Sequence, residues 1–141
     1  VIRELYDKPA DYQLNSVNRI INKWSYVTDA KALGRSDFWL LPTQFLAARG
    51  GDCEDFAILK YASLRLLGYS AEQLRILVVW DREIDNYHAV LLVYQPPWVQ
   101  WKVLDIATNK VLTADDVYRY QPVFSVNESQ MWTHGRNNKP L

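Results

Sequence analysis

Cys53, the only cysteine of the chain, follows a break formed by Gly50 and Gly51 and is preceded directly by Asp52. The stretch after it, 53–67, is long, mostly apolar and free of Gly and Pro. This pattern predicts a buried helix with Asp52 as its N-cap. Cys53 would lie in the first helical turn, where the backbone N–H groups and the helix dipole favour a nucleophilic thiolate.

A cysteine nucleophile needs a base to take its proton and a third group to orient that base. His88 and Asp105 are the candidates, because the other histidine, His134, lies in a polar C-terminal stretch. If the strands around 96–97 form a hairpin centred there, paired residue numbers sum to about 193, and His88 lies opposite Asp105. Cross-strand partners lie about 5 Å apart at Cβ, and a longer loop would shift the pairing by one or two residues. We therefore predict a Cys-His-Asp triad.

Each of these residues also has an ordinary structural interpretation. A lone cysteine on an apolar helix is often an inert core residue, a lone histidine is often structural, and Asp105 would serve equally as a strand-end cap. The position of Cys53 beside a helix start and among carboxylates favours the catalytic interpretation, because such a position is a poor core site.

Three carboxylates surround the cysteine: Asp52, Glu54 and Asp55. They would oppose the helix effect and disfavour the thiolate. One interpretation is a solvated helix start, where acidic side chains suit the dipole. The other is a site for a hard cation, with Ca²⁺ the first choice, although the spacing is not that of an EF-hand. Asp81 and Asp85, on a nearby polar turn, are weaker candidates for further ligands.

The elements that must position these residues follow from hydrophobic periodicity. Apolar residues recur at helical spacing over 14–24, residues 25–37 form a loop, and Pro42 begins another short helix before the Cys53 helix. The expected strands are 74–80, 88–94, 101–105 and 123–126, with turns at 81–86 and 109–110 and a polar tail over 127–141. Helices followed by strands predict an α+β fold with an antiparallel sheet, formed by a single domain over 1–141.

Composition excludes several classes of function. The chain has 141 residues, with 16 basic and 16 acidic side chains and no basic patch, which disfavours nucleic acid as a partner. No apolar run approaches the roughly 20 residues that span a bilayer. A single cysteine forms no internal disulfide and leaves the redox compartment open. Because the chain begins at Val1, we expect a mature or trimmed form from which any signal peptide is absent.

Several sequence strings resemble one protein family. They are Gly-Asp-Cys-Glu-Asp-Phe-Ala at 51–57, Asn-Tyr-His-Ala-Val-Leu at 86–91 and Val-Leu-Asp at 103–105. Together with 26–29, 34–39 and 122–127, they make the chain similar to the bacterial transglutaminase-like cysteine proteinases of the LapG type. The resemblance covers nearly the whole chain, and its combined motifs are specific.

The resemblance implies a papain/transglutaminase-like fold with Cys53, His88 and Asp105 as the triad. It implies dependence on Ca²⁺, with Asp52, Glu54 and Asp55 as candidate metal ligands around the cysteine. Members of the family act in the periplasm on the N-terminal region of a large surface adhesin, and cleavage releases the adhesin and disperses biofilm. An inner-membrane cyclic-di-GMP receptor sequesters such proteases, so we expect a similar partner here.

The expected chemistry is peptide hydrolysis through a thioester, with the Cys53 N–H and a second donor, Trp39 or Gln44, facing the oxyanion. Two alternatives remain open at this point. A transglutaminase or amidase would use the same triad and differ only in the acceptor. A non-enzymatic binding module would keep the fold and use calcium for structure, although the intact Cys, His and Asp set argues against it.

Overall fold

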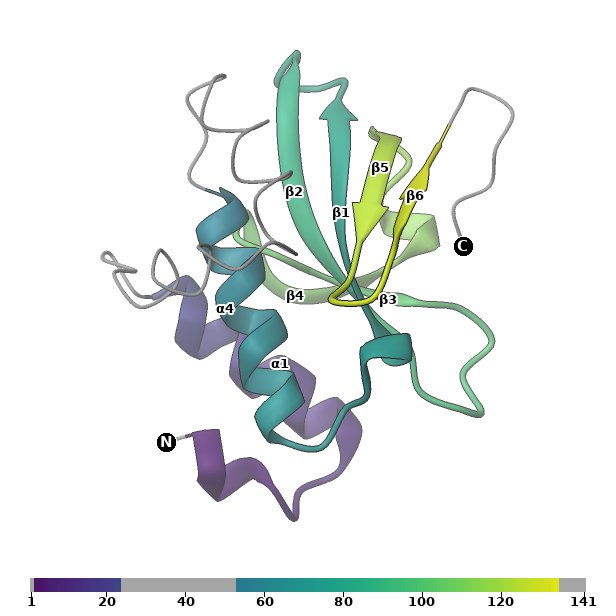
Figure 1. Cartoon of the computed structure of the whole chain (residues 1–141). Coiled ribbons are helices and arrows are strands. Elements are labelled where there is room, and N and C mark those ends of the chain that lie inside the picture. Colours follow the sequence, from purple (N-terminus) through teal and green to yellow (C-terminus); the bar gives the residue numbers. More distant parts are fainter. Residues whose placement is uncertain (1, 24–52, 135–141) are drawn as a thin grey trace.

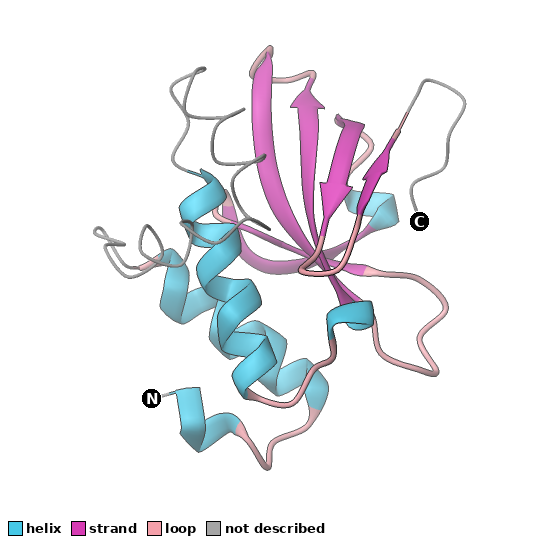
Figure 2. Ribbon diagram, in the orientation of Figure 1, coloured by secondary structure: helices cyan, strands magenta, loops and turns pink. Residues whose placement is uncertain are grey.

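The computed structural model describes residues 2–23 and 53–134. Two helices, α1 (Ala10–Asn22) and α4 (Cys53–Leu66), lie on one face of a six-stranded antiparallel sheet (Figure 1; Figure 2). In chain order the strands are β1 (Leu74–Asp81), β2 (Asn86–Val93), β3 (Lys102–Asp105), β4 (Thr108–Thr113), β5 (Tyr120–Val126) and β6 (Met131–Thr133). Their order across the sheet is β4-β3-β2-β1-β5-β6. Short 3₁₀ helices are η1 (Ile2–Leu5), η2 (Ala71–Gln73) and η3 (Ala114–Asp116). The predicted α+β class is confirmed.

The two helices form where the apolar pattern predicts them. In α1, Leu14, Val17 and Ile21 are fully buried at helical spacing. Helix α4 begins at Cys53 as predicted and ends before Gly68, whose φ is 101°. That left-handed conformation suits glycine at the position after a helix and lets the next N–H, that of Tyr69, bond the Leu64 carbonyl at 3.1 Å.

The central strands of the sheet carry buried apolar side chains on both faces. One apolar cluster lies between the helices and the sheet and includes Leu14, Ile58 and Leu91. A second cluster contains strand residues alone (Leu77, Val79, Val90, Leu92, Val103 and Tyr120) and therefore covers the face turned away from the helices. From His88 to its end, every residue of β2 is buried. The central strands thus form a rigid support for side chains at their ends.

The β2–β3 hairpin differs in register from the prediction. Leu91 pairs with Leu104 and Val93 with Lys102, so paired numbers sum to 195 instead of 193. The loop between the strands is longer than a tight turn at the two prolines. A longer loop was expected to shift the pairing by one or two residues, and the observed shift is two residues. Because side chains alternate with a period of two, a two-residue shift leaves Asp105 on the same face as His88.

Two strands contradict the sequence prediction. The turn expected at 109–110 is wrong: these residues lie inside β4, and the chain turns at 106–107 instead. The tail expected to begin at Asn127 contains β6, which pairs with β5 through Ser125 and Trp132. The predictions for 25–37, for the helix at Pro42 and for Asp52 as N-cap fall outside the described residues.

Candidate active site

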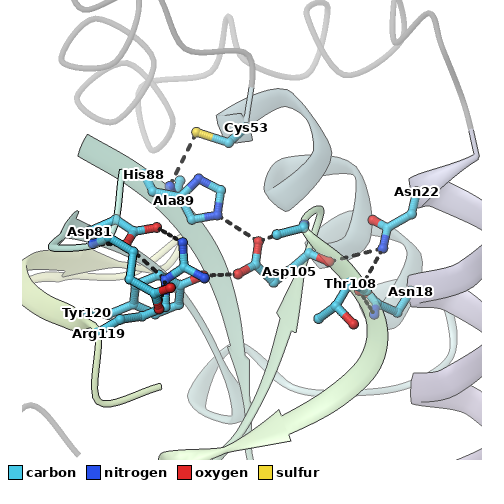
Figure 3. Close-up of polar contacts among 12 residues, drawn as sticks. Asn18, Asn22, Cys53, Asp81, His88, Ala89, Asp105, Thr108, Arg119 and Tyr120 are labelled. Atoms are coloured by element: carbon cyan, nitrogen blue, oxygen red, sulfur yellow. Dashed lines mark hydrogen bonds and ion pairs between the residues drawn. The ribbon is translucent and has the colours of Figure 1, made fainter. Parts of the chain in front are cut away.

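The thiol of Cys53 lies at the start of α4, beside the second strand (Figure 3). The backbone N–H of Ala89 donates a hydrogen bond to Cys53 Sγ at 3.3 Å. Because Ala89 directly follows His88 in β2, this bond fixes the sulfur next to the histidine. The helix start and the strand thus bring together two residues separated by 35 positions in the sequence.

His88 pairs with Asp105 as the sequence predicted. The Nε2 atom of His88 lies 2.6 Å from Oδ1 of Asp105, and both side chains are buried. Since Nε2 faces the carboxylate, Nδ1 is the ring nitrogen left for the thiol. Burial by itself would lower the pKa of His88, but the hydrogen bonds with Asp105 and Cys53 and the charges of both raise this pKa to about 10. The geometry therefore favours an imidazolium beside the sulfur.

Asp105 is held from three directions and is 1% exposed. The Ala107 N–H donates to its Oδ1 at 3.0 Å, and the Tyr120 hydroxyl donates to its Oδ2. Burial would raise the pKa of Asp105, but the bonds from His88, Tyr120 and Ala107 outweigh it and hold this pKa below its usual value. The carboxylate is therefore the stable form.

Helix α1 supports the same residue through the main chain. The Asn22 side-chain amide donates to the carbonyl oxygens of Asp105 and Thr108, both at 3.0 Å. One turn earlier, Asn18 also donates to the Thr108 carbonyl at 3.0 Å. These two asparagines hydrogen-bond the turn between β3 and β4 and so fix the backbone position of Asp105.

Two residues that interact with Asp105, one by a hydrogen bond and one through its charge, were missed by sequence reasoning. Tyr120 carried no local signal, because it comes from a strand far along the chain. Lys60 did carry a local signal in the sequence, since it is a single lysine within an apolar helix, seven positions after Cys53. It is 1% exposed. Burial lowers its pKa to about 7, and the charge of Asp105 partly opposes that change.

The acidic cluster is not a solvated helix start, as far as it is described. Glu54 and Asp55 are only 4% and 5% exposed, and both lie in the first turn of α4. Asp52 lies outside the described residues. Carboxylate oxygens are donors of the kind that suits Ca²⁺. Residues 2–23 and 53–134 contain no group of three or more His, Cys, Asp or Glu side chains able to hold a metal. The two carboxylates fit a calcium ion but do not complete its coordination.

Asp81 is not available as a metal ligand. Arg119 binds it in a bidentate manner, with Nε 2.9 Å from Oδ1 and Nη2 2.6 Å from Oδ2. The same Oδ1 also accepts the Glu83 N–H at 3.0 Å. The interpretation of Asp81 as a ligand is therefore wrong. Asp85 is exposed and occupies the turn between β1 and β2 with a φ of 54°.

The raised pKa of His88 predicts a pH dependence of stability. The ring binds more protons folded than unfolded between its ordinary value of 6.5 and about 10. Its contribution is therefore full below pH 6.5 and disappears as the pH rises to 10. Lys60, whose pKa is lowered to about 7, acts in the opposite direction over much of this range. Melting temperatures of wild type and His88→Gln, measured from pH 6 to 10, should converge as the pH rises; a constant difference would contradict the assignment.

A family model for the bacterial transglutaminase-like cysteine proteinases matches residues 5–139. The structure is also similar to that of Legionella pneumophila LapG treated with EGTA, with 35% identity and a TM-score of 0.74 over 98% of this chain and 74% of that chain. Calcium-bound LapG from the same organism shows 34% identity and a TM-score of 0.73 over 99% and 77% of the two chains. A search of curated proteins finds no match.

The fold and the matching family define the class: the chain belongs to the bacterial transglutaminase-like cysteine proteinases. Among solved structures it is similar to LapG, and the predicted transglutaminase-like protease fold is confirmed. Within the described ranges, neither helix combines the length and the apolar character needed to cross a bilayer.

Proposed function

We propose that the chain is a calcium-dependent periplasmic endopeptidase that cleaves the N-terminal region of a large surface adhesin. Cleavage would release the adhesin from the cell and disperse biofilm. The observation that supports this proposal is the buried His88–Asp105 pair beside the Cys53 thiol, at 2.6 Å between Nε2 and Oδ1. The same three residues are the triad proposed from the sequence, in a chain 34% identical to calcium-bound LapG.

In this mechanism, transfer of the Cys53 proton to Nδ1 of His88 gives the imidazolium that the site favours, and the sulfur then attacks the peptide carbonyl carbon. Asp105 keeps the proton on Nε2 and stabilises the imidazolium. Collapse of the tetrahedral intermediate breaks the C–N bond, and the imidazolium gives its proton to the leaving amine. Water, deprotonated by His88, then hydrolyses the thioester and restores the thiol. The Cys53 N–H would face the oxyanion; Trp39 and Gln44, the candidates for the second donor, lie outside the described residues.

Cleavage of a purified N-terminal fragment of the source organism's surface adhesin tests this function. Wild type should give two products with a free carboxyl and a free amine at the new ends. Cys53→Ala should give neither. Incorporation of an added primary amine into the intact, uncleaved fragment would instead identify a transglutaminase, and an unchanged fragment with wild type would favour a binding module.

Calcium would be held by Glu54 and Asp55, with Asp52 proposed as a third ligand. Its positive charge would offset the carboxylates around the thiol and so favour the thiolate. A ligand that binds only the folded state at 100 times its Kd adds about 2.7 kcal/mol to the free energy of unfolding. EGTA should therefore lower both the melting temperature and the cleavage rate.

Glu54→Gln tests the site itself, because it removes one charge without changing the side-chain shape. We expect this variant to lose most of the calcium-induced rise in melting temperature. Glu72→Gln, an exposed acid at the start of η2, is the matched control and should respond as wild type does. Equal responses of the two variants would remove Glu54 from the proposed ligand set.

An inner-membrane cyclic-di-GMP receptor is proposed as the regulatory partner. Its periplasmic domain should co-elute with the protein in size-exclusion chromatography and inhibit cleavage of the adhesin fragment. Independent elution and undiminished cleavage would limit the proposal to the protease and its substrate.

A further inference from the structure

The carboxylate of Asp105 uses its two oxygens differently. Oδ1 accepts from His88 Nε2 at 2.6 Å and from the Ala107 N–H at 3.0 Å. Oδ2 accepts from the Tyr120 hydroxyl, its one donor among the hydrogen bonds of the described residues (Figure 3). Tyr120 thus engages the oxygen that the histidine does not use. Both oxygens of the carboxylate are thus held by donors.

Tyr120 is itself fixed by the strand that carries it. It is the first residue of β5 and pairs with Asp81 of β1. Its neighbour Arg119 forms the bidentate ion pair with Asp81, which anchors the beginning of the strand. The Tyr120 ring belongs to the apolar cluster on the outer face of the sheet, and its centroid lies 5.7 Å from that of the His88 ring. The hydroxyl therefore occupies a defined position.

We propose that Tyr120 is a positioning residue of the triad, whose hydroxyl holds Asp105 Oδ2 so that Oδ1 remains on His88 Nε2. This inference rests on the proposed protease function. Without the hydroxyl, a buried oxygen of the carboxylate loses its donor, and the donors on Oδ1 alone hold the side chain against rotation about its Cβ–Cγ bond. The imidazolium then loses part of its support, although the Tyr120 hydroxyl bonds Asp105 and not the thiol.

Tyr120→Phe removes the hydroxyl and keeps the ring that packs against His88. The matched control is Tyr69→Phe, since Tyr69 is also buried and donates through its hydroxyl to Gln13 Oε1 at 3.0 Å, away from the triad. Melting curves of both variants measure the general cost of losing a buried hydroxyl. A decrease in stability common to the two variants is then separated from any effect on the site.

The first measurement needs no protein substrate. The rate of Cys53 alkylation by iodoacetate, an anion, is highest while His88 carries its positive charge and falls as the ring loses its proton. In Tyr120→Phe we expect this alkaline fall to move by about one unit to lower pH. Such a shift means that the His88 imidazolium binds its proton about tenfold more weakly. In Tyr69→Phe the profile should coincide with that of wild type.

The second measurement is cleavage of the adhesin fragment. Tyr120→Phe should lower kcat about tenfold, equivalent to about 1.4 kcal/mol in the barrier, with KM unchanged. Profiles and kcat values equal to those of Tyr69→Phe would overturn the inference. A shift of the alkaline fall to higher pH would also overturn it, because it would mean that the hydroxyl only withdraws charge from Asp105.

Failure of the proposed function gives a different result. If wild-type Cys53 reacts slowly, and equally in wild type and His88→Ala, the thiol is not activated and both proposals fall. If wild-type alkylation is fast and depends on His88 while Tyr120→Phe matches its control, only the role of Tyr120 is rejected.

Discussion

Replacement of Cys53 or His88 by alanine should lower cleavage of the adhesin fragment by about 10³-fold or more, since each removes a group that forms or breaks bonds. His88 is the base that the geometry offers to the thiol: its Nε2 is held by Asp105, and its other hydrogen-bonding contact is Cys53. The double variant should be no slower than the slower single variant, because the two residues act as a unit. Initial rates of fragment cleavage measure this.

The chain provides a matched control for the histidine. His134 is the other histidine and hydrogen-bonds Ser125 Oγ at 2.9 Å, on the edge strands away from α4. His134→Ala should retain cleavage within about twofold of wild type, as expected for a change outside the reacting groups. A large loss in His134→Ala, or full activity in His88→Ala, would contradict the assignment of the base.

The proximity of Cys53, His88 and Asp105 could be predicted from the sequence because it depends on local rules. A glycine break before an apolar segment places Cys53 at a helix start, and Cys53 is the first residue of α4 in the described range 53–134. The alternation of side chains in a hairpin then relates His88 to Asp105. The register was wrong by two residues, but an even shift does not change the face of the sheet. The contact between His88 and Asp105 was therefore predicted correctly although the predicted register was wrong.

The surroundings of Asp105 could not be found in this way. Tyr120 reaches it from β5, which lies on the far side of β1 and β2 in the sheet order, and Lys60, on a helix, interacts with its charge. Such contacts depend on the strand order, which hydrophobic periodicity does not give. Strand β4 was mistaken for a turn because its exposed residues Asn109 and Lys110 are typical of turns.

The Asp105→Asn variant tests whether the carboxylate acts on His88 through its charge or through its hydrogen bond. The donors around Asp105 decide how the asparagine amide is oriented. The Ala107 N–H points at the Oδ1 position, so the amide oxygen of asparagine should occupy it and continue to accept from His88. The amide NH₂ would then face Tyr120, whose hydroxyl can rotate to accept. The histidine would keep its proton on Nε2, unlike the wrong tautomer that accompanies a loss of about 10⁴ in serine proteases.

What Asp105→Asn does remove is the negative charge of the carboxylate. Without the carboxylate, the pKa of His88 should fall from about 10, because the attraction that opposes its burial is gone. Lys60 loses the same attraction, so its pKa should fall below about 7. We expect kcat/KM to fall about 10²-fold, within the range of acid–base catalysis, and the alkaline fall of the pH profile to move to lower pH.

Combination with Tyr120→Phe separates the two effects. With phenylalanine at 120, no hydroxyl accepts from the new amide, and nothing but the Ala107 N–H selects the amide orientation. Asp105→Asn/Tyr120→Phe should therefore be slower than the product of the single effects predicts, a coupling that kinetic double-mutant analysis detects. Additive losses would mean that Ala107 alone orients the side chain. An unchanged alkaline fall in Asp105→Asn would show instead that the carboxylate charge does not support the imidazolium.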